Sequence, residues 1–322
     1  MKAKKIIALS MLISAFAAVP AFARLEGITR IFYIVSDEMS MTQKAMSSEA
    51  GLNKLLTEEI QLKSVTASDS KELNRAFLRA SISNGSHVFM SQEDFMPEAY
   101  KIVKENPELK VVVIGGKIPE NKKLTNLYAL SYDEERAAFL AGYTAGALSE
   151  NKKVALLTSE KECAKTAEVK KGFIEGVKKA TLARGRKVKI KTCIAENLHN
   201  DEIAGKVAGH LYSEGTDVIY FVGETGLHTV HAEAAKAGKK VIFVKQDETS
   251  YLYPEDKAVL AVVSKNNTRT IEKVFHEINE GTHESERNIE ISITPGEYEF
   301  SINPAGHSDS AIEREIEELA SE

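Results

Sequence analysis

Short apolar runs and longer amphipathic segments alternate along most of this chain, and this alternation constrains the fold more than any other feature. Runs rich in β-branched and aromatic residues predict strands, and the segments between them carry apolar residues at helical spacing. The first series predicts strands at Ile31–Val35, Gln61–Thr66, His87–Met90, Lys110–Ile114 and Leu127–Leu130, with helices at about Gln43–Thr57, Ser70–Ser83 and Pro97–Glu105. Such alternation implies a parallel sheet with helices on both faces and right-handed crossovers.

The same alternation restarts in the second half of the chain. It predicts strands at Lys153–Thr158, Val188–Ile194, Asp217–Val222 and Lys240–Val244, with helices near Thr166–Ala180, Asp201–Ser213 and Gly226–Ala237. Between the two series, Asp133–Arg136 places acidic residues at the start of a helix rich in Ala and Gly, where they suit the helix dipole. The small residues of this helix suit close packing where the chain crosses from one unit to the other.

The C-terminal part is too short for a third complete unit. It predicts a strand at Val259–Ser264 and a helix at Thr268–Asn279, followed by a hairpin about Pro295-Gly296 and a terminal helix at Ser310–Leu319. The two strands of the hairpin are predicted at Asn288–Ile293 and Glu297–Ile302. A tail of this kind fits a chain that crosses back and completes both sheets. We therefore predict an α/β protein of two doubly wound parallel-sheet lobes joined by a multi-crossover hinge. Lobe 1 is expected to comprise residues 24–132 plus about 259–283, and lobe 2 residues 133–258 plus about 284–322.

The N-terminal segment predicts export. Three lysines precede an uncharged apolar run, residues 6–19, and the triplet Ala21-Phe22-Ala23 follows. This order is typical of a secretory signal peptide, here residues 1–23 with cleavage after Ala23, rather than of a buried N-terminal helix. The run is shorter than the roughly twenty residues of a membrane-spanning helix. Because no cysteine follows it, we expect a periplasmic protein without a lipid anchor that does not span the membrane.

The charge of the chain bears on nucleic-acid binding, and its cysteine content bears on disulfide formation. The formal net charge is −5, and Lys and Arg are interspersed with Asp and Glu, so the chain offers no basic stripe for a nucleic acid. The two cysteines, Cys163 and Cys193, are expected near the carboxyl ends of neighbouring segments of the second lobe. A disulfide between them is feasible in an exported protein. Two unpaired thiols are the alternative.

Several segments follow one another in a family-specific order. They are Lys101-Ile-Val-Lys-Glu-Asn-Pro-Glu-Leu-Lys, Tyr132-Asp-Glu-Glu-Arg-Ala-Ala-Phe-Leu-Ala-Gly-Tyr, Gly172-Phe173-Ile-Glu-Gly176-Val177, Asp217-Val-Ile, Gly223-Glu-Thr-Gly226, and Asp247 followed by Lys265. In these segments the chain resembles the basic membrane protein family of substrate-binding proteins, which includes purine-nucleoside-binding lipoproteins of nucleoside ABC importers. The resemblance implies a type I periplasmic-binding-protein fold, a small-molecule ligand, an ABC transporter permease as partner and no cofactor.

The chain departs from this family at several ligand-contacting positions. Lys44 and Ala45 stand where the family tends to have Phe and Asn, and Val169 stands where an aromatic residue is common. Lys245 replaces the first acid of an Asp-Ser-Asp motif, and the strand that ends at Ile114 lacks the usual terminal Asp. Since aromatic side chains would stack on a base, the resemblance predicts the scaffold better than the ligand.

The ligand site is expected at the carboxyl ends of the strands. Open parallel sheets bind ligands in the crevice beyond those ends, and in two facing lobes these ends meet at the cleft. The loops at that edge contain the expected ligand-binding residues Asp37, Gln92, Phe95, Ser159, Glu224, Thr225, Asp247 and Lys265. Their hydroxyl, carboxylate, amide and ammonium groups suit a neutral polar molecule such as a nucleoside.

Several of these residues have an alternative interpretation. The pattern and the family resemblance agree on Asp247 and Lys265, which could bind sugar hydroxyl groups or instead form a salt bridge at the hinge. Asp37 could equally cap a helix, and Phe95 could pack within its loop.

We expect neither a metal site nor catalysis. His228 and His231 are spaced as on one helix face, but a zinc site needs a further ligand, so we interpret them as surface residues. The sequence contains no Gly-x-Ser-x-Gly elbow. The function predicted is that of an extracytoplasmic, monomeric substrate-binding protein of an ABC importer that closes on its ligand. The alternatives are a sensory binding protein that presents its closed form to a receptor or histidine kinase and, less well supported, a secreted nucleoside hydrolase.

Overall fold

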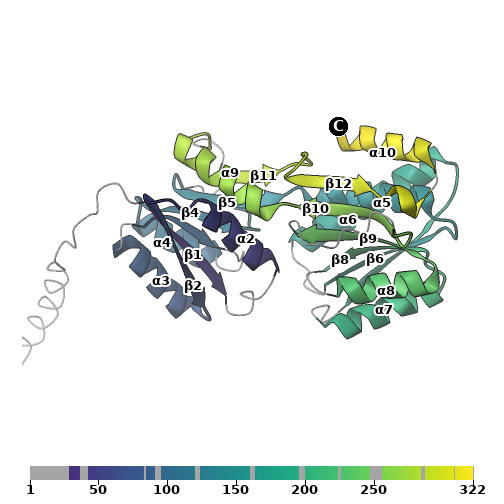
Figure 1. The fold of residues 1–322 in the computed structure, drawn as a ribbon, viewed down its shortest axis with the longest axis horizontal. Helices are drawn as coiled ribbons and strands as arrows, with labels where there is room; N and C mark the ends of the chain where they lie inside the picture. Colours follow the sequence, from purple (N-terminus) through teal and green to yellow (C-terminus); the bar gives the residue numbers. More distant parts are fainter. Residues whose placement is uncertain are drawn as a thin grey trace, which may run out of the picture.

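The computed structural model describes residues 29–36, 43–82, 85–90, 96–119, 124–159, 164–195, 200–223, 226–246, 256–283, 287–307 and 309–321. These residues form two lobes, each built around its own sheet and each covered by helices on both faces (Figure 1). The expected signal peptide lies outside the described residues. In the part that is described, no helix combines the length and the apolar character needed to span a membrane.

The first lobe contains a sheet of six parallel strands in the order β11-β5-β4-β3-β1-β2. The strands are β1 (Thr29–Ser36), β2 (Ile60–Ala67), β3 (Gly85–Met90), β4 (Lys110–Ile114), β5 (Leu127–Tyr132) and β11 (Asn288–Ile291). Its helices are α2 (Gln43–Lys54), α3 (Ser70–Ile82), α4 (Met96–Glu105) and α9 (Asn267–Glu280). Side chains alternate along β1, so that Ile31 and Tyr33 pack with α2 and α9, whereas Phe32 and Ile34 pack with α3 and α4.

The second lobe contains a six-stranded sheet in the order β12-β10-β9-β8-β6-β7, which is parallel except for β12. The strands are β6 (Lys153–Ser159), β7 (Lys189–Ala195), β8 (Val218–Val222), β9 (Lys240–Gln246), β10 (Val259–Lys265) and β12 (Tyr298–Ile302). Helices α5 (Glu134–Leu148) and α6 (Ala164–Ala183) pack together, as do α7 (Asp201–Ser213) and α8 (Leu227–Ala237). The last helix, α10 (Ser310–Ser321), packs on α5.

Helices α5 and α6 approach each other closely because glycines lie at their interface. A Cβ atom at Gly172 would lie 2.1 Å from the carbonyl oxygen of Glu135, and one at Gly142 would lie 2.1 Å from that of Phe173. Neither glycine could be replaced by a larger residue unless the two helices moved apart, because the obstructing atoms belong to the backbone. The small residues of the crossover helix therefore serve the close packing that the sequence predicts.

The predicted fold class is confirmed, but two C-terminal segments lie in other places than expected. Strand β10, expected in lobe 1, pairs with β9 in the second sheet, whereas β11, expected in lobe 2, pairs with β5 in the first. Helix α9, between them, packs on α2 of the first lobe. The predicted hairpin is also wrong, since β11 and β12 complete different sheets and the turn between them retains only the bridge from Thr294 to Tyr298. Local turn residues cannot show which distant strand each arm will pair with.

Within the described residues, the chain consequently passes between the sheets at three places. The first crossover leads from β5 into α5, the second from β10 into α9, and the third from β11 to β12. Figure 1 shows α9, β11, β10 and β12 lying along the side where the two lobes join. The multi-crossover hinge that the C-terminal tail predicts is therefore present.

Candidate functional site

The carboxyl ends of the two sheets face each other, which is where a ligand site is expected. Lys117 follows β4 of the first lobe, and its Nζ lies 2.7 Å from Oε1 of Glu168, in the first turns of α6 of the second lobe. Closer to the crossovers, Asn267 at the start of α9 donates a 2.7 Å hydrogen bond to Gln246, the last residue of β9. Three of these four residues, Lys117, Gln246 and Asn267, lie at or shortly after the ends of strands.

Most of the expected ligand-binding residues lie outside the described residues. These are Asp37, Gln92, Phe95, Glu224, Thr225 and Asp247. Ser159 is the last residue of β6 and Lys265 the last residue of β10. The structure therefore brings these two to the same edge of the second sheet, and it describes the side chain of Lys265.

Lys265 is buried against a carboxylate. The residue is 3% exposed, and its Nζ lies 2.5 Å from Oε1 of Glu134, the first residue of α5. The same Oε1 lies 3.3 Å from Nζ of Lys165 in α6. The other carboxylate oxygen accepts a hydrogen bond of 3.3 Å from the hydroxyl group of Tyr298. Lys265 therefore forms a salt bridge at the hinge with Glu134. The salt bridge considered from the sequence involves Asp247, which lies outside the described residues.

Two aromatic rings enclose the Lys265 ammonium group. Its Nζ lies 5.2 Å from the centroid of the Tyr132 ring and 5.6 Å from that of the Tyr298 ring. The two rings are 4.9 Å apart and inclined at 60°. Both distances are within the range of cation–π attraction. We call Tyr132, Glu134, Lys165, Lys265 and Tyr298 the crossover centre.

The charges of the crossover centre depend on each other. Burial by itself would raise the pKa of Glu134, but the positive charges of Lys165 and Lys265 outweigh it and lower the pKa to about 2. Burial raises the pKa of Tyr298 well above its ordinary value, and the neighbouring Glu134 charge adds to this rise. Glu134 is therefore ionised and the Tyr298 phenol protonated at neutral pH, which agrees with the hydrogen bond between them.

The sequence alone did not identify Glu134 as part of this site. The acid pair Glu134-Glu135 was interpreted only as a helix start, and Asp133 does cap α5, since its side chain accepts a hydrogen bond from the Arg136 backbone N–H. The available signal was the presence of one more acid than a helix cap requires. This signal does not show whether Glu134 or Glu135 turns toward the interior.

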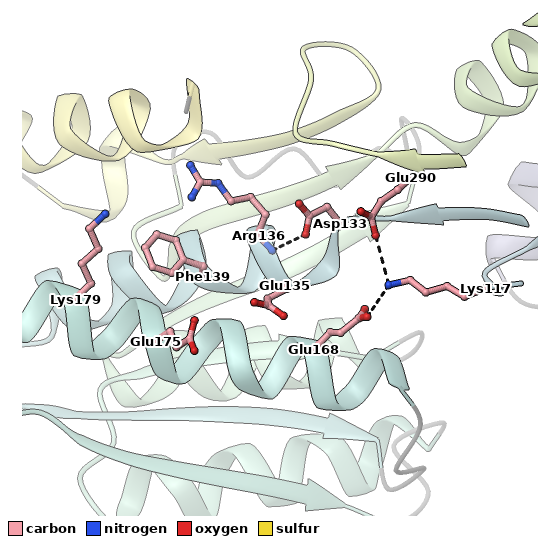
Figure 2. Close-up of a pocket in the computed structure, with 9 residues that line it drawn as sticks. All are labelled: Lys117, Asp133, Glu135, Arg136, Phe139, Glu168, Glu175, Lys179 and Glu290. Carbon is pink, nitrogen blue, oxygen red and sulfur yellow. Dashed lines mark hydrogen bonds and ion pairs between the residues drawn. The ribbon is translucent and has the colours of Figure 1, made fainter. Parts of the chain in front are cut away.

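A cavity of about 550 Å³ lies beside the crossover centre, between α5, α6 and the end of β11 (Figure 2). We call it the charged groove, and its lining residues are Lys117, Asp133, Glu135, Arg136, Phe139, Glu168, Glu175, Lys179 and Glu290. Lys117 bridges Glu168, at 2.7 Å, and Glu290, at 3.5 Å. Of the two expected ligand-binding residues that the structure describes, Ser159 and Lys265, neither is among those that line the groove.

Two other residues singled out in the sequence, Val169 and His231, have different surroundings from those expected. Val169, expected at a stacking position, is 1% exposed and packs in the core with Phe173. Lys44 lies in α2, but its side chain is not described. His231 is not a surface residue, because its side chain is 14% exposed and its Nε2 lies 2.8 Å from Oδ2 of Asp256.

Of the two cysteines, the structure describes Cys193. Cys193, in β7, is half-buried and is a free thiol in the structure, so the disulfide considered from the sequence is not formed there. Burial raises the pKa of this thiol. Cys163 lies outside the described residues.

Comparison with known proteins gives a consistent family relationship. Residues 30–316 match the model of the family described as ABC transporter substrate-binding protein PnrA-like. Basic membrane protein A2 of Borrelia garinii subsp. bavariensis is 25% identical over 303 residues, covering 92% of this chain and 86% of that protein. Basic membrane protein A of Borreliella burgdorferi is 25% identical over 281 residues, covering 85% of this chain and 80% of that protein.

Solved structures share the fold at lower identity. A solute-binding protein of an ABC transporter system from Aeropyrum pernix has a TM-score of 0.68 at 14% identity, covering 91% of this chain and 85% of that one. A periplasmic ribose ABC transporter protein from Conexibacter woesei has a TM-score of 0.65 at 14% identity, covering 89% and 97%. A transcriptional activator of the comK gene from Bacillus halodurans has a TM-score of 0.72 at 16% identity, covering 91% and 96%. The architecture is therefore shared by proteins of different function.

Proposed function

Since the chain belongs to the PnrA-like family of ABC transporter substrate-binding proteins, we propose that it captures a small polar molecule between its lobes and delivers it to an importer permease. The observation that carries this proposal is the charged, buried Lys265 at the carboxyl end of β10, where the chain crosses between the lobes. Parallel sheets bind ligands beyond that edge. A ligand that contacts both lobes would favour the closed form.

The ligand we propose is a nucleoside or a related pentose-containing compound. Lys265 can donate to hydroxyl or ring oxygens, and Asp247 can accept from two vicinal hydroxyl groups. The similar fold from Conexibacter woesei is described as a ribose transporter, which is consistent with a sugar-recognising site on this scaffold. Because Val169 is a core residue and Lys44 is not aromatic, we expect recognition of the sugar to contribute more than stacking on the base.

The remaining expected contacts complete the proposed site. Asp37, Gln92 and Phe95 would approach the ligand from the first lobe, and Ser159, Glu224 and Thr225 from the second. Solute-binding proteins of ABC transporters are extracytoplasmic. For this chain we further propose cleavage after Ala23 and a monomer that is free in the periplasm.

The direct test is to identify what the protein carries. Small molecules released by denaturing purified residues 24–322 would be identified by mass spectrometry, and binding would be measured by calorimetry with purine and pyrimidine nucleosides, D-ribose and D-arabinose. We expect at least one nucleoside to bind. Absence of both a co-purified compound and binding to any member of this panel would refute the nucleoside proposal.

The site is tested separately with variants. We expect Asp247→Ala and Lys265→Met to lose affinity for the compound that binds. Lys236→Ala is the matched control, because the Lys236 side chain is 76% exposed on α8. Unchanged affinity in both site variants would show that the ligand does not bind at the carboxyl end of β10.

A further inference from the structure

Two adjacent acids at the start of α5 have different surroundings. The Glu134 side chain is 8% exposed and contacts the ammonium groups of Lys265 and Lys165. The Glu135 side chain is 36% exposed and pairs at 2.7 Å with Lys171 on the surface of α6. Both acids suit the positive end of the helix dipole. The helix start therefore accounts for an acid at either position but not for the burial of one of them.

Glu134 links all three crossovers in the described part of the chain. It stands at the end of the first crossover itself, and its Oε1 pairs with Lys265, where the second begins. Its Oε2 accepts from Tyr298, which ends the third. A single carboxylate thus joins chain segments up to 164 residues apart in sequence.

The orientation of Lys265 depends on this carboxylate. A lysine side chain has many rotamers and its ammonium group is strongly hydrated, so burial without a counter-charge is costly. In this structure the ammonium group of Lys265 contacts one carboxylate oxygen of Glu134 and lies beside two tyrosine rings. An aromatic ring attracts a cation at many positions over its face, whereas a carboxylate forms a charge-assisted hydrogen bond with a defined direction. Removing the Glu134 carboxylate would therefore take away a charged contact that directs the ammonium group of Lys265.

We propose that Glu134 is a positioning residue for ligand binding, which fixes Lys265 at the cleft edge and joins the three crossovers into one pivot. This inference rests on the proposed function, because it assigns Glu134 an effect on affinity that acts through Lys265. It also has a consequence that does not require a ligand, namely that the three crossovers loosen together when the carboxylate is neutralised.

The first experiment measures binding of guanosine, adenosine and D-ribose to Glu134→Gln, with Glu135→Gln as the matched control. We expect Glu134→Gln to weaken binding roughly tenfold or more, because a buried ion pair loses one partner. Glu135→Gln should stay within about twofold of the wild type, as expected for an exposed pair. In a Lys265→Met background, Glu134→Gln should have no further effect on affinity. Wild-type affinity in Glu134→Gln, or an equal loss in both backgrounds, would overturn the positioning role.

The second experiment follows backbone hydrogen exchange without ligand in the same variants. We expect Glu134→Gln to accelerate exchange in residues 131–136, 264–267 and 294–298 together, and Glu135→Gln to leave the last two segments unchanged. The double variant Glu134→Gln/Lys265→Met removes both buried charges and guards against misfolding of the single variant. Exchange that stays at the wild-type rate in all three segments of Glu134→Gln would refute the pivot. If no compound co-purifies with wild-type protein and no member of the full nucleoside and sugar panel binds it, the nucleoside proposal fails, while this experiment still decides whether Glu134 holds the three crossovers together.

Discussion

The crossover centre and the charged groove share the first turn of α5, yet their charges have opposite environments. Glu134 turns into the crossover centre, where its side chain is 8% exposed. Its neighbours Asp133, Glu135 and Arg136 line the groove, where Glu135 is 36% exposed (Figure 2). Surface ion pairs contribute little to stability because water screens them, whereas breaking a buried pair leaves an uncompensated charge. Burial, more than the number of nearby charges, therefore decides how much each of these residues contributes to stability.

His87 in the first lobe extends the comparison to a second buried titratable side chain. Burial is the main cause that lowers the pKa of His87 to about 4, with the Lys110 charge acting in the same direction and a hydrogen bond with Asn279 opposing both. Glu134, equally buried, stays ionised because two ammonium groups surround it. A buried titratable side chain is thus neutral in the first lobe and charged at the crossovers.

The largest expected effect comes from breaking the buried pair. We expect Glu134→Ala to lower the free energy of unfolding by about 3–5 kcal/mol, because the buried ammonium group of Lys265 would lose the Glu134 carboxylate. Urea unfolding followed by circular dichroism would measure this change. Glu135→Ala should lower it by less than about 1 kcal/mol, and equal losses in the two variants would contradict the contrast between the centre and the groove.

The second effect is an acid-dependent loss of stability that originates in His87. The folded-state pKa of about 4 lies below the ordinary value of 6.5, so the unfolded state binds more protons between these values. Stability should therefore fall as the pH drops from about 6.5 to 4, by on the order of 3 kcal/mol from this group.

Urea unfolding at several pH values would measure the loss in the wild type and in His87→Leu. The variant should lack most of the loss in this window, and His210→Leu should retain it, since the His210 side chain is 69% exposed. The same pH dependence in His87→Leu and the wild type would assign the loss to other groups.

A third effect should follow at lower pH from Glu134. Its folded-state pKa of about 2 lies below the ordinary 4.5, so its contribution is complete above pH 4.5 and is lost as the pH falls toward 2. The loss should be on the order of 3 kcal/mol at most, because each unit of difference between the folded and unfolded pKa corresponds to about 1.4 kcal/mol. We expect it to remain in His87→Leu and to be absent from Glu134→Gln. Its persistence in Glu134→Gln would exclude Glu134 as the source.

The smallest effect is expected in the groove. Lys117→Gln removes an ion pair between the lobes in which Lys117 is 50% exposed and Glu168 29% exposed. We expect a loss below about 1 kcal/mol, and the difference from the wild type should vanish in about 1 M salt, where the Debye length is roughly 3 Å. A larger loss that persists in high salt would show that the groove is as strongly coupled as the crossover centre.

The sequence predicted strands best where they are buried on both faces. The run Lys110–Ile114 was predicted with the bounds that β4 has, and Val111, Val112 and Val113 are fully buried. A central parallel strand is apolar throughout, so its signal does not depend on neighbours. The edge strands β11 and β12 were found as strands but paired incorrectly, since their partners depend on which sheet each edge reaches.

The candidate site was predictable only in part. Lys265 was found because it follows a strand, which is a local feature. The position of Val169 was misjudged, because the orientation of α6 decides whether that residue turns toward the cleft or the core. Glu134 was overlooked as a contact of Lys265, which lies 131 residues further along the chain.

By itself, the sequence determined the two α/β units, most of their strands and the acidic start of the helix that joins them, because periodicity and apolar runs are local properties of the chain. Only the tertiary structure decided that β10 and β11 exchange lobes and that Glu134, not Glu135, meets Lys265. The physical reason is that a buried ion pair requires two groups to reach the same water-excluded place, and three separate crossovers bring these groups together.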